Sequence, residues 1–136
     1  MTKHDANTVS SIVLDPSVLL ALLFNEPGID KAIGRGGDGI MSSVSSSEAV
    51  AKSLDCQVPM ETISQALAGL KLVLVPFGEE HALGAAAAWR PETRKLDFSF
   101  ADWACRATAK VRKLPVLTAD RGWLKADLRI KIHLIR

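Results

Sequence analysis

The stretch of sequence that decides the fold is Ile12-Val13-Leu14-Asp15-Pro16-Ser17-Val18-Leu19-Leu20-Ala21-Leu22-Leu23-Phe24. Its first three residues predict a short apolar strand, and the apolar run after Ser17 predicts a helix that is buried on every side. Pro16 suits the first position of that helix, because the backbone N–H that proline lacks would have no partner there. The following residues, Asn25-Glu26-Pro27-Gly28, end the helix. The stretch therefore predicts a strand, a tight turn and a buried helix.

Strands and helices alternate along the rest of the chain. We expect further strands at residues 40–42, 72–75, 115–118 and 130–135, and further helices at 29–33, 43–54, 59–70, 79–89 and 99–112. The glycine-rich residues 34–39 and the polar residues 90–95 predict loops, and residues 121–124 predict a short helical segment. Apolar strands separated by helices are typical of a parallel sheet that is covered on both faces. The pattern therefore predicts an α/β fold, a three-layer α/β/α sandwich with a mostly parallel central sheet of about five strands.

Length and composition fit one domain. A chain of 136 residues with 48% hydrophobic content forms one compact core and is too short for two ordinary domains. We expect a flexible tail at residues 1–10 and a single domain over residues 11–136. Because no apolar run is long enough to span a membrane and the start does not resemble a signal peptide, we expect a cytoplasmic protein without membrane association. We also expect Cys56 and Cys105 to be reduced and buried, and the three histidines to lie at surface or edge positions.

Four acidic residues stand where a strand or loop ends and a helix begins: Asp15, Glu48, Asp102 and Asp120. Each of them has a possible structural role in capping a helix or stabilising its first turn. The carboxyl ends of parallel strands meet at one edge of a sheet, however, so the four carboxylates would repel one another unless a cation lies among them. Several carboxylates without Cys or His suit Mg²⁺ or Mn²⁺ better than zinc. The sequence therefore predicts a metal site, with helix capping as an open alternative for each acid.

The charge balance points to a polyanionic ligand. The net charge is +2, from 17 basic and 15 acidic residues. If four of the acids form one cluster, the remaining 11 acids face all 17 basic residues. An acidic pocket in a basic surround suits a polyanion that needs metal at the reacting phosphate and Lys or Arg along its backbone. An ordinary solvated surface is the alternative.

Four segments resemble, in order and spacing, the acidic motifs of PIN-domain ribonucleases of the VapC toxin type. They are Val13-Leu14-Asp15-Pro16, Ser45-Ser46-Ser47-Glu48, Phe98-Ser99-Phe100-Ala101-Asp102 and Leu117-Thr118-Ala119-Asp120. The resemblance covers almost the whole chain after the first ten residues. Pro16, Ser45 and Trp103 depart from the usual family residues. The changes at Ser45 and Trp103 are expected to affect substrate contacts or water positioning more than metal binding.

The resemblance implies metal-dependent endonucleolytic cleavage of RNA by the toxin of a type II toxin–antitoxin pair. Asp15 and Asp102 would bind Mg²⁺ or Mn²⁺ directly, while Glu48 and Asp120 would complete the shell or hold the attacking water. It also implies a cognate antitoxin protein as partner, and a homodimer. Transfer RNA, ribosomal RNA and messenger RNA meet the same chemical requirements, so the identity of the RNA stays open.

Further residues and two other functions complete the sequence-based expectations. Thr118 is expected to orient an acid or a water, or to be an ordinary strand residue, and Arg94, Lys95, Arg121 and Lys125 are candidate contacts to the RNA backbone. A catalytically inactive PIN-like module that binds RNA or protein is one alternative function. A receiver-like signalling domain is the other, although its paired acids after the first strand have no counterpart here.

Overall fold

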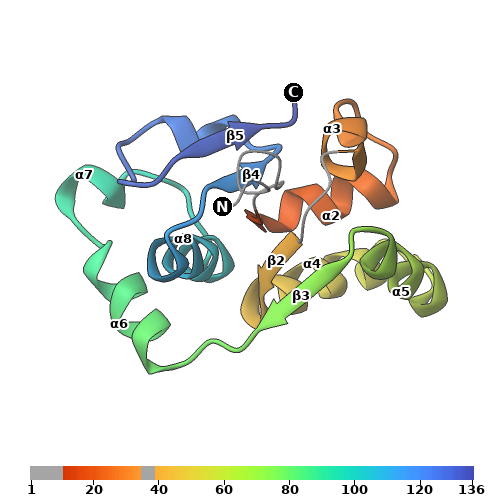
Figure 1. The fold of residues 1–136 in the computed structure, drawn as a ribbon, viewed down its shortest axis with the longest axis horizontal. Coiled ribbons are helices and arrows are strands. Elements are labelled where there is room, and N and C mark those ends of the chain that lie inside the picture. The colour runs from red at the N-terminus through yellow and green to blue at the C-terminus, as the bar shows by residue number, and fades with distance from the viewer. Residues whose placement is uncertain (1–10, 35–38) are drawn as a thin grey trace, which may run out of the picture.

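A five-stranded parallel sheet with helices on both faces forms the body of the protein (Figure 1). The computed structural model describes residues 11–34 and 39–136. The elements are, in chain order, β1 (Ile12–Leu14), α2 (Pro16–Leu23), α3 (Ile29–Gly34), β2 (Gly39–Ser42), α4 (Ser43–Asp55), α5 (Met60–Gly69), β3 (Leu72–Val75), α6 (Glu79–Ala87), α7 (Pro91–Arg94), α8 (Phe100–Arg112), β4 (Val116–Thr118), the 3₁₀ helix η1 (Arg121–Leu124) and β5 (Ile132–Leu134). The predicted sandwich with about five strands is therefore confirmed.

The order of the strands places β1 at the centre of the sheet. The order is β3-β2-β1-β4-β5, and every neighbouring pair is parallel. A receiver-like domain would instead have the order 2-1-3-4-5. The receiver-like alternative is therefore wrong.

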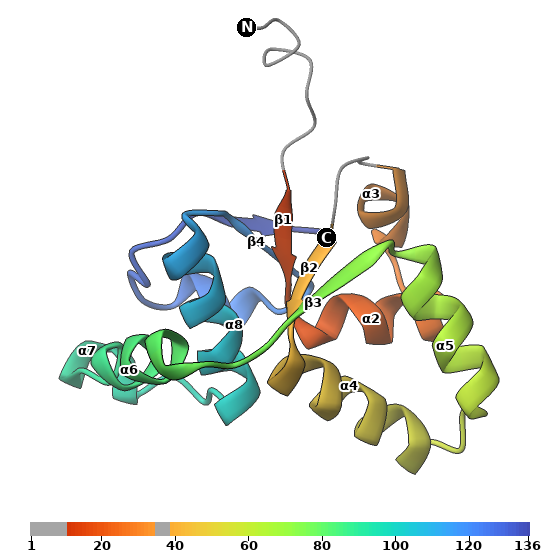
Figure 2. The same cartoon turned by 60° about the horizontal axis from the view of Figure 1, so that its bottom comes forward.

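Two apolar clusters lie on opposite faces of the sheet. Ile12 and Leu14 of β1 belong to the cluster under α2, α3 and α5, whereas Val13 belongs to the cluster under α6 and α8. This alternation follows from the two-residue period of a strand. Figures 1 and 2 show the two groups of helices on either side of the sheet, with α4 beyond the end of β2. Both faces of the central strand β1 are therefore buried from solvent.

Short-range capping explains where the two helices nearest the predicted site begin. Asp15 is the N-cap of α2, and its side chain accepts a hydrogen bond from the backbone N–H of Ser17. Ser99 is the N-cap of α8 and forms a reciprocal capping box with Asp102. The predicted helix starts are confirmed, and the capping alternative is correct for both acids.

Small and polar residues form the inward face of α4, although the spacing of the apolar residues Val44, Ala51 and Leu54 favours those positions for the core. Ala51 and Leu54 are exposed, and Val44 is only partly buried. The residues that pack inward are Ser45, Ser46, Ala49 and Ser53. Serine is tolerated there because its hydroxyl has a local partner: Ser53 donates to the carbonyl of Ala49 over 2.8 Å.

The expected loop at residues 90–95 contains the short helix α7. Pro91 occupies its first turn, and the hydroxyl of Thr93 accepts from the backbone N–H of Arg90 over 2.9 Å and donates to the carbonyl of Ala88 over 2.6 Å. The buried Thr93 hydroxyl thus provides hydrogen-bond partners for backbone groups at the end of α6 and at the start of α7.

Two expectations for single residues are also wrong, and others lie outside the described part of the chain. Cys56 is exposed, although Cys105 is buried as expected. His81 is buried and bonds through Nδ1 to the backbone at the start of α6. The tail at residues 1–10 and the middle of the glycine-rich loop, residues 35–38, are not among the described residues. No helix in the described part is both long and apolar enough to cross a bilayer.

Candidate active site

All four predicted acids line one pocket at the carboxyl ends of the strands. The pocket has a volume of about 250 Å³, and its acidic residues are Asp15, Glu48, Asp97, Asp102 and Asp120. Asp15 follows β1, Asp120 follows β4, and Glu48 stands in the helix that continues from β2. Parallel topology therefore brings together acids that are far apart in the sequence, as the predicted convergence requires.

Asp15 is the most deeply buried of these acids, with 2% of its surface exposed. Its Oδ2 atom accepts three hydrogen bonds, from the backbone N–H of Ser17 over 3.2 Å, from the Ser17 hydroxyl over 2.6 Å and from the Thr118 hydroxyl over 3.0 Å. Its Oδ1 atom is buried and has no hydrogen-bond partner among the described residues. One carboxylate oxygen is thus fixed in place while the other lacks a partner.

Burial and mutual repulsion make the charged state of this acid pair costly. Burial raises the pKa of Asp15 from 3.8 to about 7, the hydrogen bond from Ser17 opposes the rise, and the charge of Asp102 adds to it. Burial also raises the pKa of Asp102, although the hydrogen bonds at Ser99 oppose the rise, and the charge of Glu48 adds to it. Without a cation, the two carboxyls compete for a proton near neutral pH.

Asp102 both caps the start of α8 and lines the acidic pocket. Its Oδ2 atom accepts from the backbone N–H of Ser99 over 2.9 Å, which fixes the side chain beside the first turn of the helix. The hydroxyl of Ser45 donates to the carbonyl of Ala101 over 2.9 Å and joins α4 to the start of α8. The unusual Ser45 is therefore a packing contact beside the site rather than a lining residue of the pocket.

Glu48 and Asp120 lie at the more open side of the pocket. Glu48 pairs with Lys52 one turn further along α4, with Oε1 and Nζ 3.5 Å apart. Asp120 caps η1, since its Oδ1 accepts from the backbone N–H of Gly122 over 2.8 Å, and its own N–H donates to the Thr118 hydroxyl over 3.0 Å. Thr118 therefore links Asp15 to Asp120, and the expectation that it orients an acid is confirmed.

Three residues of the pocket escaped the sequence analysis: Ser17, Lys52 and Asp97. Ser17 follows the helix-capping Asp15 by two residues, a spacing from which a hydroxyl commonly reaches the cap, so a signal was present. Lys52 stands four residues after Glu48, which is a helical ion-pair spacing. Asp97 lies before α8 in an irregular segment, where no periodic pattern marks it.

The predicted RNA contacts and Trp103 lie elsewhere. Arg94 lies over the ring of Trp89 at 5.9 Å, and Nη1 of Arg121 donates to the carbonyl of Arg136 over 3.3 Å. Trp103 is buried against Phe98, with ring centroids 4.9 Å apart. None of these residues is among those that line the acidic pocket.

The donors in the pocket fit a hard divalent cation. Carboxylate oxygens are the ligands that Mg²⁺ and Mn²⁺ favour, and the buried Oδ1 of Asp15 lacks a partner that such a cation would provide. Across residues 11–34 and 39–136, however, no three His, Cys, Asp or Glu side chains are already close enough together to hold a metal ion. The pocket thus contains suitable metal ligands, but its carboxylates are not yet close enough together to coordinate one ion.

The chain belongs to the PIN-domain family, because the model of the PIN domain matches residues 12–128. Comparison of the sequence with curated proteins finds no match. The fold is similar to chains in solved toxin–antitoxin structures. DNA-bound VapBC from Salmonella typhimurium gives a TM-score of 0.72 at 17% identity, covering 95% of this chain and 100% of that chain. VapBC2 from Rickettsia felis, bound to a promoter DNA fragment, gives 0.70 at 12% identity, covering 92% and 98%. VapBC-5 from Mycobacterium tuberculosis gives 0.61 at 23% identity, covering 93% and 98%.

Proposed function

We propose that the protein is a Mg²⁺- or Mn²⁺-dependent endoribonuclease that acts as the toxin of a type II toxin–antitoxin pair. The observation that carries the proposal is the state of Asp15, whose Oδ2 is fixed by three donors while its buried Oδ1 has none. Membership of a family whose domains are generally nucleases supports the chemistry. Similarity of fold to chains from VapBC complexes supports the toxin role.

Asp15 and Asp102 would hold the cation, and Glu48 and Asp120 would complete its shell or hold water. When bound, a divalent cation supplies positive charge to a scissile phosphate and a more acidic water. The chain prepares this site through its own hydrogen bonds. Ser17 and Thr118 hold Asp15, and Ser99 holds Asp102, so both carboxylates need little rearrangement on binding. Thr118 also fixes the backbone of Asp120 and so couples the end of β4 to the end of β1.

The proposal is tested by Asp15→Asn and Asp102→Asn. Each variant keeps the size and most of the capping of the original side chain, so it should fold. We expect Mn²⁺ binding in isothermal titration calorimetry to weaken strongly, and Mg²⁺-dependent cleavage of total RNA to fall by at least ~100-fold. The matched control is Asp127→Asn, whose acid lies near β5 and bonds the backbone of Arg129.

Two results separate the alternatives. If the wild-type protein binds no Mn²⁺ and cleaves no RNA, the inactive PIN-like binding module is the better description. If the folded Asp15→Asn and Asp102→Asn variants cleave as fast as wild type, the assignment of the site is wrong even though the protein is a nuclease.

Apolar surface near the acidic pocket supports a protein partner such as a cognate antitoxin. Phe100, in the first turn of α8, is 61% exposed, and Trp89 is 54% exposed. Large exposed aromatic side chains are typical of interaction sites. Phe24 and Ile33, at the ends of α2 and α3, are also about half exposed and support the proposed homodimer. Multi-angle light scattering of the protein alone tests the homodimer, and the same measurement with the product of a neighbouring gene tests the antitoxin. We also propose a cytoplasmic location for the protein.

A further inference from the structure

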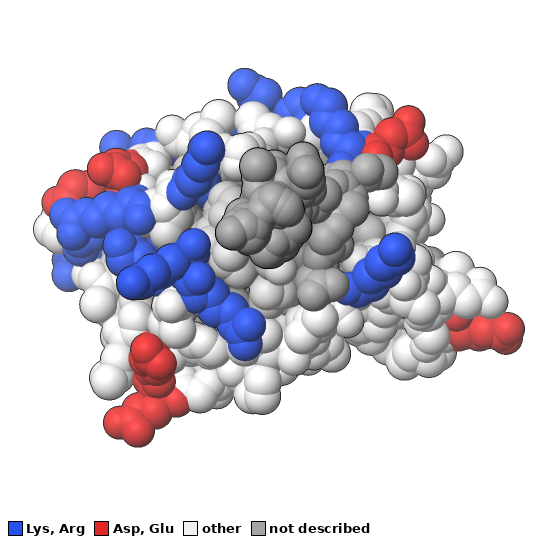
Figure 3. All heavy atoms as spheres, in the orientation of Figure 1, with Lys and Arg blue, Asp and Glu red and all other residues white. Residues whose placement is uncertain are grey.

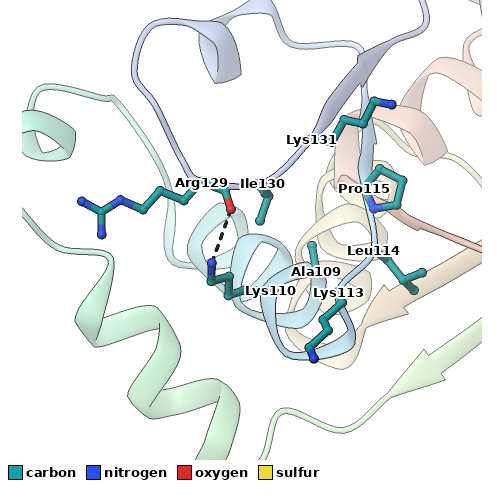
Figure 4. A pocket seen from close by; sticks show the side chains of 8 residues that line it. All are labelled: Ala109, Lys110, Lys113, Leu114, Pro115, Arg129, Ile130 and Lys131. Carbon is teal, nitrogen blue, oxygen red and sulfur yellow. Dashed lines mark hydrogen bonds between the residues drawn. The ribbon is translucent and has the colours of Figure 1, made fainter.

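A second pocket lies at the opposite end of α8. It has a volume of about 430 Å³ and is formed by the last turn of α8, the turn into β4 and the segment before β5. Four cationic side chains line it: Lys110, Lys113, Arg129 and Lys131 (Figure 4). Its apolar part includes Leu114 and Ile130. Because Asp102 lines the acidic pocket and Lys110 and Lys113 line this one, a rise of ~1.5 Å per helical residue separates the two pockets by ~15 Å.

The cations of the basic pocket are not neutralised by the acids that the structure describes. The ion pairs among the described residues involve Lys52, Arg90 and Arg136. Lys110 donates from Nζ to the carbonyl of Arg129 over 3.5 Å, which closes the pocket between α8 and the β5 side. The carboxylate of Asp127 accepts from the backbone N–H of Arg129 over 2.8 Å. Figure 3 shows Lys and Arg side chains gathered on this face, over the region of α8 and the approach to β5.

The preference of a helix end for cations does not explain all of this charge. Lys110 and Lys113 stand at the carboxyl end of α8, where a cation interacts favourably with the helix dipole. Arg129 and Lys131 come from a different segment, so the sequence preference of a helix end for cations does not explain their presence. The charged ends of Arg129 and Lys131 point outward in different directions, so the four cations surround the opening of the pocket rather than face one another (Figure 4). Together they make the surroundings of the pocket positive, which favours the binding of an anion.

Backbone preference does not explain the cations either. Lys113 has a φ of 57° and Arg129 a φ of 60°, both in the left-handed region, where glycine is the residue that adopts the conformation without steric cost. Lys71 has the same type of conformation, with a φ of 52°, outside the pocket. The conformation alone therefore marks no site, but it provides a way to remove the charges without disturbing the backbone.

We propose that the basic pocket binds a backbone phosphate of the RNA substrate, at a distance from the phosphate that is cleaved. The proposal rests on the proposed ribonuclease function. Lys and Arg supply the charge that a phosphodiester needs, and Leu114 and Ile130 offer an apolar surface to the attached sugar or base. With ~15 Å between the two pockets, a substrate that fills both must extend over several nucleotides, so the enzyme should favour long or structured RNA over short fragments.

The test uses Lys113→Gly, Arg129→Gly and the double variant in the full-length protein. Glycine fits the φ of both positions, so these variants should fold as stably as wild type. Lys71→Gly is the matched control, because it removes one cation at a left-handed position outside the pocket. Binding of a fluorescent 30-nucleotide hairpin RNA is measured by anisotropy in EDTA, which prevents cleavage, at several salt concentrations.

We expect the double variant to raise the Kd for the hairpin roughly tenfold and to reduce the slope of log K against log salt by about two. Each single variant should have about half the effect on the slope, and Lys71→Gly should have none. Cleavage of a dinucleotide, which is too short to reach the basic pocket from the acidic one, should be unchanged in all variants.

Three results would overturn the proposal. If wild type binds the hairpin and the double variant binds it with the same Kd and slope, the basic pocket does not contact RNA, while the ribonuclease function stands. If adenosine 5′-monophosphate binds wild type and not the double variant, with hairpin affinity unchanged, the pocket is a free-nucleotide site. If wild type neither binds nor cleaves RNA, the proposed function fails and this inference fails with it.

Discussion

The two ends of α8 carry opposite charge and are built in different ways. At its start, Asp102 is held by Ser99, and the neighbouring Asp15 is buried and fixed by three hydrogen bonds. At its end, Lys110 and Lys113 are exposed, and one 3.5 Å contact joins Lys110 to Arg129. At the acidic end, hydrogen bonds hold the carboxylates in place although their charges repel each other. At the basic end, the charged side chains are exposed and few contacts fix their positions. Changes at the acidic end should have large effects that depend on shape, and changes at the basic end smaller effects that depend on salt.

The largest expected effect is on the stability of the metal-free protein as the pH changes. Between pH 3.8 and about 7 the unfolded chain ionises Asp15, while the folded protein keeps the proton because burial raises the pKa of Asp15. The folded state then binds more protons than the unfolded state, so stability falls as the pH rises through this window and levels off above it. We expect a decrease in the free energy of unfolding on the order of 4 kcal/mol, measured by urea denaturation in EDTA.

The variant Asp15→Asn shows whether this loss comes from the acidic end. Asparagine can still cap α2 and carries no charge, so the variant should be more stable than wild type above pH 7 and should lose most of the pH dependence. Asp97→Asn removes an exposed acid from the same pocket and should leave the curve as in wild type. A wild-type stability that rises between pH 4 and 7 in EDTA would contradict the description of the acidic end as strained by charge.

Removing Thr118 from the hydrogen-bond network should have the next largest effect. Thr118→Val keeps the β-branched shape in the buried strand β4 but deletes the hydroxyl that donates to Asp15 and accepts from Asp120. Because a hydrogen bond to a charged group contributes ~1.5 kcal/mol or more, we expect RNA cleavage to slow by about tenfold. Mn²⁺ affinity should fall in parallel, as measured by calorimetry.

Thr108→Val is the matched control for this prediction. Thr108 is also fully buried, and its hydroxyl donates to the carbonyl of Ala104 within α8, away from the acidic pocket. Its replacement should change stability by ~1 kcal/mol at most and leave cleavage unchanged. Equal losses of activity in the two variants would mean that Thr118 acts through general stability rather than by holding Asp15.

Much of the acidic end could be predicted from the sequence, because its signals are local and its convergence is topological. Asp15 before Pro16, and Ser99 before Asp102, mark helix starts, and a parallel sheet brings such starts to one edge. The buried face of α4 could not be predicted, because serines become core residues only when partners such as the Ala101 carbonyl are in place. Periodicity detects apolar faces and misses polar faces that are satisfied by hydrogen bonds.

The basic end could not be predicted from the sequence for a different reason. Its cations come from residues 110–113 and 129–131, which look in the sequence like an ordinary helix end and the start of an ordinary strand. Only the pairing of β4 with β5 brings the two segments together. The residues that the sequence favoured as RNA contacts, such as Arg94 and Arg121, line neither this pocket nor the acidic pocket.

The smallest expected effect concerns Lys52, the single cation among the described residues that line the acidic pocket. Its ion pair with Glu48 spans 3.5 Å, and the Lys52 side chain is 59% exposed, so solvent screens the interaction. Lys52→Met keeps the helix and the aliphatic stem, and should change the free energy of unfolding by less than ~0.5 kcal/mol and cleavage by less than about threefold. Lys31→Met, at an exposed position of α3, is the control for loss of one positive charge. A loss of activity above about tenfold in Lys52→Met alone would mean that this cation contacts the reacting phosphate, and that the acidic end depends on a fixed positive charge as well as on its carboxylates.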